Sequence, residues 1–135
     1  MKVAVFTRYK NDKLCTLLSD LQKQSISVMI NVYSDKVFSY SGVNIVKTPG
    51  MNIAQKRNLA IKWVEDDEFL LMLDDDNRIF DKNFLVNLQS FYTKIKESSK
   101  IISPIVYYRT TTKIQSAGVK FCFLFGKVFV NRKIK

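Results

Sequence analysis

The sequence predicts an α/β protein with a mainly parallel, doubly wound sheet flanked by helices, and a β-hairpin near the C-terminus. Strand-like apolar runs alternate with amphipathic helical patterns in the order β-α-β-β-α-β-α-β, which is typical of parallel strands joined by helical crossovers. Residues 69–73 are five consecutive apolar residues, the pattern of a strand buried on both faces. Three carboxylates, Asp74, Asp75 and Asp76, follow this run directly.

Three strands and one helix are predicted in the first fifty residues. The β-branched and apolar runs at 2–7, 27–32 and 43–46 predict strands, and the last of them ends at a Thr-Pro-Gly turn. Residues 12–24 predict an amphipathic helix, because leucines recur at the i, i+3, i+4 and i+7 positions of one face. Residues 35–42 are rich in turn formers.

Two further helices are predicted, each after a residue that can cap its N-terminus. Asn52 is expected to cap a helix from residue 53 to about 65, and Asp81 is expected to cap a helix that runs to about 97. The second helix has one apolar side, which we expect to be buried and which consists of Phe84, Leu85, Leu88, Phe91, Tyr92 and Ile95.

The last third of the chain predicts a strand and a hairpin. Residues 101–107 form the strand, and Pro104 within it is typical of a sheet edge. Residues 120–130 predict a hairpin that turns at Gly126 and contains four phenylalanines. These side chains belong either to the core, which is the favoured interpretation, or to an edge that contacts a membrane.

Composition restricts the classes of function. A chain of 135 residues with 47% apolar residues is expected to form one domain, residues 1–135, with an ample core. There is no apolar stretch of membrane-spanning length and no signal-peptide pattern, which predicts the cytoplasm, with peripheral attachment to a membrane as the alternative. Cys15 and Cys122 are expected to be buried thiols. The absence of histidine excludes Ser-His-Asp and Cys-His nucleophiles and His-ligated zinc.

The charge is large and unevenly distributed. The net charge is +10, seven of the 12 acids lie between residues 65 and 76, and no acid follows Glu97. This favours an anionic partner, which is nucleotide phosphate, nucleic acid or an anionic membrane. Nucleic acid is disfavoured, because the cations are spread through the chain and no nucleic-acid motif is present. The alternative is that the chain belongs to a longer protein whose remaining part balances the charge.

Polar residues follow three of the predicted strands, and the acid triplet is the most informative of these groups. The carboxyl ends of parallel strands form the usual ligand edge of an α/β sheet. This edge brings together 7–9, 31–35 and 74–76. Adjacent carboxylates repel, and a hard cation such as Mg²⁺ or Mn²⁺ would relieve that repulsion and carry substrate phosphates. The alternative is a solvated acidic turn that Asn77 helps to form.

The helix expected after Asn52 adds positive groups beside these acids. Its N-terminus would offer free backbone N–H groups to an anion. Lys56 and Arg57 lie one turn into the helix and would both face a phosphate, unless they only form a solvated helix face. A metal that joins Asp76 to a diphosphate, with Arg57 nearby, is a coherent arrangement for binding a nucleoside diphosphate.

These residues resemble a known family. The segment 52–61, Asn-Ile-Ala-Gln-Lys-Arg-Asn-Leu-Ala-Ile, followed by 69–76, Phe-Leu-Leu-Met-Leu-Asp-Asp-Asp, is similar to the N-x-G-x-x-x-A-R-N segment and D-x-D strand of the family 2 glycosyltransferases with the Rossmann-like GT-A fold. The opening residues 3–11, the leucine-rich helix, and the segments 102–104 and 114–118 also fit. The resemblance covers roughly residues 2–118.

The resemblance implies transfer of a sugar, with inversion, from a nucleotide-sugar donor to a hydroxyl of a glycan, protein or lipid acceptor. Asp76 would ligate Mn²⁺ or Mg²⁺ on the diphosphate, Asp74 would face the ribose or join Asp76 as a metal ligand, and Thr7 to Tyr9 would border the base. The family's base-binding Asp at the end of strand two aligns with Asn31, and Asp35 is the second choice. The residues expected to bind the donor are Thr7, Tyr9, Asn31, Asp35, Asn52, Arg57, Asp74 and Asp75.

The sequence departs from the family pattern in three places. The glycine expected after Asn52 is displaced by Ile53-Ala54, and Asn31 replaces the base-binding Asp. The family's catalytic domain is also longer, and its general base is a carboxylate that follows the central strands, whereas no acid follows Glu97. The chain is therefore expected to lack the acceptor-binding section, as a fragment of an enzyme or as a binding remnant without transfer activity. A basic nucleic-acid-binding protein and a metal-dependent phosphohydrolase are the less favoured hypotheses.

Overall fold

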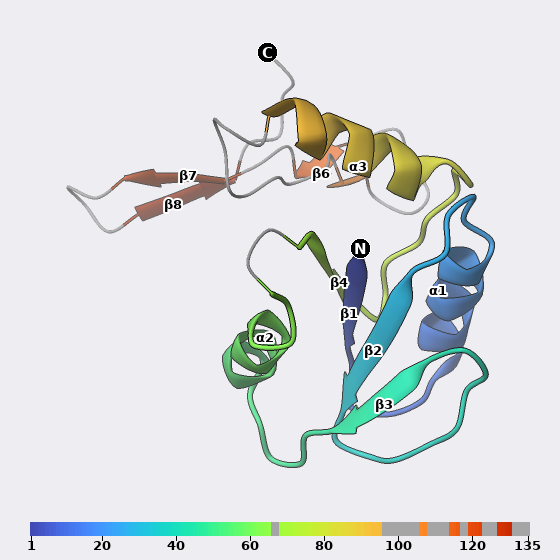
Figure 1. Ribbon diagram of the computed structural model, residues 1–135. Coiled ribbons are helices and arrows are strands. Elements are labelled where there is room, and N and C mark those ends of the chain that lie inside the picture. The colour runs from blue at the N-terminus through green and yellow to red at the C-terminus, as the bar shows by residue number, and fades with distance from the viewer. Residues whose placement is uncertain (66–67, 96–105, 108–113, 117–118, 123–126, 131–135) are drawn as a thin grey trace. The chain divides into compact units, whose positions relative to one another are not determined.

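A four-stranded parallel sheet forms the centre of the N-terminal part of the chain (Figure 1). The computed structural model describes residues 1–65, 68–95, 106–107, 114–116, 119–122 and 127–130. The chain divides into two compact units, Met1–Phe91 and Tyr92–Lys135. The sheet and all of the site residues predicted from the sequence belong to the first unit.

The order in which the chain adds strands to the sheet reverses at the first strand. β1 (Lys2–Phe6), β2 (Met29–Ser34), β3 (Asn44–Lys47) and β4 (Leu70–Asp74) are all parallel, in the order β3-β2-β1-β4. The chain therefore moves outward from β1 through β2 to β3 and then returns past β1 to β4. Phe6, the last residue of β1, is paired with Tyr33 on one side and Asp74 on the other. The carboxyl ends of β1 and β4 mark the switch point where α/β sheets bind ligands.

Two helices connect these strands on opposite sides of the sheet (Figure 1). α1 (Asp12–Gln22) connects β1 to β2, and α2 (Ile53–Ile61) connects β3 to β4. The opposite placement follows from handedness, because right-handed crossovers that travel in opposite directions lie on opposite faces. The prediction of a doubly wound, Rossmann-like α/β fold is confirmed.

Both faces of the sheet are covered by apolar side chains. One cluster consists of Ala4, Phe6, Tyr33 and Ala60, with Val46, Leu59, Leu70 and Met72 packed against it. The alternate strand residues, which point to the other face, are buried as well, as are four leucines of α1; these are Val3, Val5, Ile30, Val32, Leu14, Leu17, Leu18 and Leu21. Burial on both faces explains why the inner strands are continuously apolar.

Several predicted element boundaries differ from the structure by one to four residues. The second strand is Met29–Ser34 instead of 27–32, so it extends two residues further toward the carboxyl edge. The second helix ends at Ile61 rather than near residue 65. The helix at Asp12 begins as predicted, because Asn11 caps it by accepting a hydrogen bond from the Leu14 N–H.

The third helix begins later than the sequence predicts. α3 spans Phe84–Ile95, and Asp81 stabilises the preceding turn by accepting from the Asn83 N–H, at 2.8 Å, rather than capping the helix. Leu85 and Leu88 are buried as expected, but Phe91 is 51% exposed, so its predicted burial is wrong. No helix in the described residues is both long and apolar enough to cross a membrane.

The second unit contains two pairs of short antiparallel strands. β5 (Val106–Tyr107) pairs with β6 (Ile114–Ser116), and β7 (Val119–Cys122) pairs with β8 (Lys127–Val130). The second pair confirms the predicted hairpin, although its expected turn at Gly126 lies outside the described residues, as do Pro104 and the first residues of the strand expected at 101–107. β6 was not predicted.

A buried lysine attaches the start of β1 to the connection between α2 and β4. Lys2 is 8% exposed, and its ammonium donates to the Glu68 carboxylate and, at 3.0 Å, to the Trp63 carbonyl. It also lies 5.3 Å from the centre of the Trp63 ring. The hydrogen bond from Lys2, followed by one from the Glu65 N–H, lowers the pKa of Glu68 below its ordinary value of 4.5.

This contact predicts a specific loss of stability in acid. The pKa of Glu68 is lower in the folded chain than in the unfolded chain, so its contribution is complete above pH 4.5 and disappears as the pH falls through the folded value. Glu68→Gln is therefore expected to reduce the free energy of unfolding at neutral pH and to flatten its decline below pH 4.5. Urea unfolding at a series of pH values measures this. Glu65→Gln is the control, because only the backbone of Glu65 takes part, and equal effects of the two variants would contradict the assignment.

Candidate functional site

The candidate site lies at the carboxyl edge of the sheet, around the ends of β1, β2 and β4. The loop after β1 begins at Thr7, Asp35 follows β2, and Asp75 follows β4. The N-terminal turn of α2 faces the same edge, because Lys56 from α2 contacts both the Thr7 carbonyl and Asp35. The structure therefore brings together the three strand ends and the helix that the sequence analysis selected.

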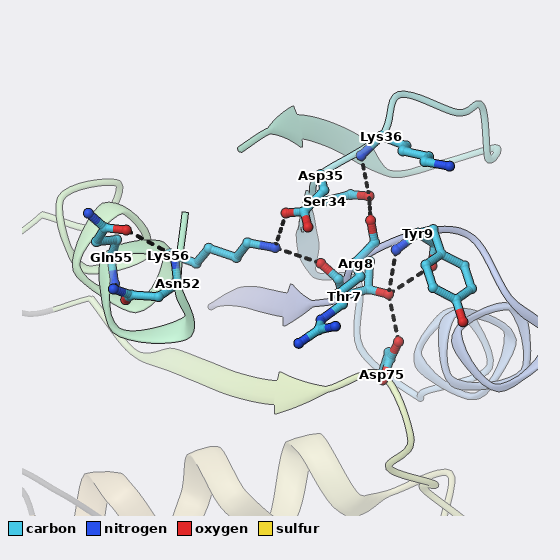
Figure 2. A network of polar contacts seen from close by, with 10 residues as sticks. All are labelled: Thr7, Arg8, Tyr9, Ser34, Asp35, Lys36, Asn52, Gln55, Lys56 and Asp75. Carbon is cyan, nitrogen blue, oxygen red and sulfur yellow. Dashed lines mark hydrogen bonds and ion pairs between the residues drawn. The ribbon is translucent and has the colours of Figure 1, made fainter. Parts of the chain in front are cut away.

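Asp75, the middle acid of the triplet, is used by the fold itself (Figure 2). Its Oδ2 atom accepts hydrogen bonds from the Thr7 hydroxyl at 2.6 Å and from the Asn11 amide at 2.9 Å. Its backbone N–H donates to the Phe6 carbonyl at 3.2 Å, which continues the pairing of β1 and β4 by one residue. Asn11 is also the N-cap of α1. Asp75 thus connects β4, β1 and the start of α1.

Lys56 joins the ends of β1 and β2. Its side chain extends from α2 toward these ends (Figure 2), and only 5% of it is exposed. Nζ donates to Asp35 Oδ1 at 2.6 Å and to the Thr7 carbonyl at 2.8 Å. The Asp35 N–H donates to the Arg8 carbonyl at 3.2 Å. The predicted solvated or phosphate-facing position of Lys56 is therefore wrong, because the carboxylate of Asp35, the residue after β2, neutralises the buried ammonium.

The N-terminus of α2 is capped by side chains. The side-chain Oδ1 of Asn52 accepts from the Gln55 N–H, and the Gln55 side chain accepts from the Asn52 N–H, both at 2.9 Å. This capping box confirms Asn52 as the N-cap. It satisfies two of the four N–H groups that a helix start leaves free, so the positive end of α2 is only partly open to an anion.

Arg57 and Asp74 form an exposed ion pair beside this network. The guanidinium Nη2 lies 3.3 Å and 3.5 Å from the two carboxylate oxygens of Asp74. The side chains are 46% and 53% exposed, and the guanidinium lies 5.8 Å above the Phe6 ring. Exposed pairs contribute less than about 1 kcal/mol, so both partners can exchange to a ligand at small cost.

Asp76 is exposed and has no hydrogen bond or ion pair with any other residue that the structure describes. Asn77 closes the turn behind it, because its N–H donates to the Asp74 carbonyl and its side chain accepts from the Asp74 N–H, both at 3.2 Å. The acids thus lie in a turn that Asn77 stabilises. Asp74 and Asp76 are the two members of the triplet whose carboxylates remain accessible.

The two accessible carboxylates could hold a hard cation only together with oxygen atoms of a bound substrate. Within the described parts of the chain, no group of three or more His, Cys, Asp or Glu residues is arranged to hold a metal. Asp74 and Asp76 supply two carboxylates. Mg²⁺ commonly binds one or two carboxylates together with substrate phosphates and water, so this pair suits a metal that arrives with a diphosphate.

Asn31 does not lie at the end of the second strand. It is the third residue of β2, only 7% exposed, and its side-chain oxygen accepts from the Asn44 amide of β3 at 3.0 Å. Because the strand extends to Ser34, the residue that follows it is Asp35. Asp35 therefore occupies the position that the sequence analysis gave to Asn31.

Two contacts within the candidate site were not predicted from the sequence. Asn11 precedes a helix and has the residue type of an N-cap, so its capping role was detectable, whereas its bond to Asp75 was not. The partnership of Lys56 with Asp35 spans 21 residues, and no local pattern indicates it. The remaining predicted site residues, Thr7 and Tyr9, lie in the loop after β1, where Tyr9 is 54% exposed.

The structure resembles solved glycosyltransferase structures. A crystal structure of S. aureus TarS residues 1–349 matches with a TM-score of 0.56 and 20% sequence identity over 76% of this chain and 38% of that chain. A second TarS structure matches with a TM-score of 0.53 and 20% identity, over 83% of this chain and 24% of that chain. TarS is a glycosyltransferase.

The fold is glycosyltransferase-like. The chain spans well under half the length of either TarS structure. The sequence matches no protein-family model and no curated protein.

Proposed function

We propose that the carboxyl edge of this sheet binds a nucleotide-diphospho-sugar through Mn²⁺ or Mg²⁺, as the donor site of an inverting GT-A glycosyltransferase of family 2. The observation that supports this most directly is that the three acids of the triplet have different surroundings. Asp75 is held by Thr7 and Asn11, while Asp74 and Asp76 remain exposed at the switch point of the sheet. A purely structural acidic turn has no need of two outward carboxylates beside an arginine.

The exposed groups suit the parts of such a donor. Asp74 and Asp76 would hold the metal, which as a Lewis acid would stabilise the departing nucleoside diphosphate. Arg57 lies within 3.3 Å of Asp74 and would supply guanidinium donors to the same diphosphate. These three side chains place two negative charges, which suit the metal, beside a positive charge, which suits the diphosphate.

The base and ribose would lie against the ends of β1 and β2. Tyr9 offers a half-exposed ring for stacking. Asp35 retains a carboxylate oxygen beyond the one that Lys56 holds, and this oxygen would accept from an N–H on the base edge. A carboxylate accepts from N–H groups, and uracil, guanine and cytosine all present such donors on the base edge.

Calorimetric titration with UDP-, GDP- and CDP-sugars, in Mn²⁺, in Mg²⁺ and in a chelator, tests the proposal. We expect binding that weakens at least about tenfold when the metal is removed, because the two carboxylates and the diphosphate then repel one another. Equal binding in the chelator would overturn the metal assignment. Binding of none of the nucleotides would overturn the donor site.

A second candidate function is donor binding without sugar transfer. It is favoured by the absence of any Asp or Glu after Glu97 in this sequence, because inversion requires a base that deprotonates the acceptor hydroxyl. Assays of donor hydrolysis, and of transfer to glycan, protein and lipid acceptors, distinguish the two. Binding without turnover supports the second candidate, and turnover by this chain alone excludes it.

A further inference from the structure

A concave surface lies on the α1 side of the sheet, and none of its lining residues belongs to the acid triplet. It is a pocket of about 260 Å³ between the end of α1 and the segment that joins β4 to α3, lined by Asp20, Lys23, Gln24, Arg78, Phe80 and Lys82, with Ile79 beneath. Asp20 lies eight residues into α1, roughly 12 Å along the helix from the carboxyl edge. The proposed donor site and this pocket share no residue.

Within residues 1–65 and 68–94, the most exposed large apolar side chain belongs to this pocket. Phe80 is 80% exposed, and the Arg78 guanidinium lies 5.1 Å from the centre of its ring. Arg78 is in turn fixed by Asp20, which is 9% exposed and accepts from Arg78 Nε at 2.7 Å and from the Ile79 N–H at 3.2 Å. The buried carboxylate of Asp20 thus fixes Arg78, and the Arg78 guanidinium in turn lies against the exposed ring of Phe80.

The backbone under Phe80 is also held to the end of α1. The Ser25 N–H donates to the Lys82 carbonyl at 2.9 Å. The Gln24 side chain donates to the Asp81 carbonyl at 3.0 Å and accepts from the Leu85 N–H at 3.1 Å. The exposed ring therefore stands on a segment that hydrogen bonds hold on both sides, and its exposure is built into the fold.

The pocket also contains exposed cations. Lys23 and Lys82 are exposed residues of its lining, and its one lining acid, Asp20, is paired with Arg78. The exposed Asp81, next to Phe80 in the chain, adds one negative charge beside the pocket. The surface therefore combines an exposed aromatic ring with a net positive charge. The second unit adds to the positive charge of the chain, because Tyr92–Lys135 contains ten Lys and Arg residues and a single acid, Glu97.

We propose that the pocket around Phe80 docks the chain on an anionic lipid bilayer. Phe80 enters the interface between headgroups, and Lys23, Lys82 and the free donors of Arg78 bind lipid phosphates. An anionic bilayer complements both properties of the surface, since an exposed apolar side chain gains from burial among lipids and the neighbouring cations gain from the negative surface potential. The inference is independent of the proposed donor site.

Sedimentation with phosphatidylcholine vesicles, with and without phosphatidylglycerol, tests the proposal on the full chain. Binding is expected only to the anionic vesicles and is expected to weaken as salt increases. Lys23→Glu should lower the partition coefficient by about tenfold or more, since each cation near an anionic leaflet contributes about fivefold. Phe80→Ala should lower it by about fivefold, while Phe80→Leu, which keeps an apolar side chain, should retain most of the binding.

Lys62→Glu is the matched control. Lys23 and Lys62 are exposed C-cap residues of α1 and α2, so the two variants change the same charge at the same kind of helix end on opposite faces of the sheet. Equal losses in the two variants would show general charge attraction and overturn the pocket, as would equal binding to both vesicle types. If the chain bound RNA but not vesicles, and if Lys23→Glu abolished the RNA binding, the surface would be assigned to nucleic acid instead.

Discussion

Lys56→Met is expected to destabilise the fold by about 2 kcal/mol and to weaken donor binding. Removing one partner of a buried ion pair leaves the other charge without compensation, which costs 3–5 kcal/mol at a fully buried site. The cost is lower here because the Asp35 side chain keeps about 35% of its exposure. The Thr7 carbonyl also loses its donor, and the ends of β1 and β2 lose the ammonium that joins them.

Urea unfolding and nucleotide titration measure the two effects. Arg57→Met is the matched control for stability, because it removes the neighbouring cation of the same helix from an exposed pair and is expected to cost less than about 1 kcal/mol. Asp35→Asn in the Lys56→Met background should recover part of the loss, since the unpaired carboxylate is then absent. Equal destabilisation by the Lys56 and Arg57 variants would show that the buried pair does not support the site.

Asp75→Ala and Asp76→Ala are expected to have opposite consequences. Asp75→Ala removes the acceptor shared by Thr7 and Asn11 and should lower the free energy of unfolding by about 2 kcal/mol, because charged hydrogen bonds are lost near the core. Asp76→Ala removes an exposed carboxylate and should change stability by less than about 0.5 kcal/mol. It should, however, reduce metal-dependent nucleotide binding by at least about tenfold, as expected for loss of a metal ligand.

Thermal or urea unfolding without ligand, combined with titration in Mn²⁺ and in a chelator, separates these outcomes. Asp76→Ala should bind nucleotide equally in both conditions, because the metal no longer contributes. If Asp76→Ala retained a metal-dependent increase in affinity equal to that of the unchanged protein, Asp76 would not be a metal ligand. If Asp75→Ala were as stable as the unchanged protein, the link between β4, β1 and α1 would be energetically unimportant.

The parallel sheet was predictable because its determinants are local and repeated. Continuous apolar runs indicated strands buried on both faces, and leucines at helical spacing indicated α1. The structure has both, and Leu14, Leu17 and Leu18 are fully buried. The acid triplet was also correctly located, because it directly follows the run that forms β4.

The contacts within the site were less predictable, because they join distant residues. Asn31 was placed at a strand end because the second strand was predicted to end at residue 32 and the family's base-binding Asp aligns with Asn31, but Asn44 on the neighbouring strand satisfies its side chain. The strand could therefore continue to Ser34, and Asp35 took the edge position. Similarly, the sequence could not separate Asp75 from its neighbours, because its partners Thr7 and Asn11 lie 68 and 64 residues away.

Lys56 and Arg57 are consecutive, yet they serve strand ends on opposite sides of β1. Lys56 reaches Asp35 after β2, and Arg57 reaches Asp74 at the end of β4, because neighbouring residues of an α-helix point about 100° apart. An insertion or deletion of one residue in the first turn of α2 would rotate both cations away from their partners at once. Evolutionary changes of length should therefore be excluded from the start of α2.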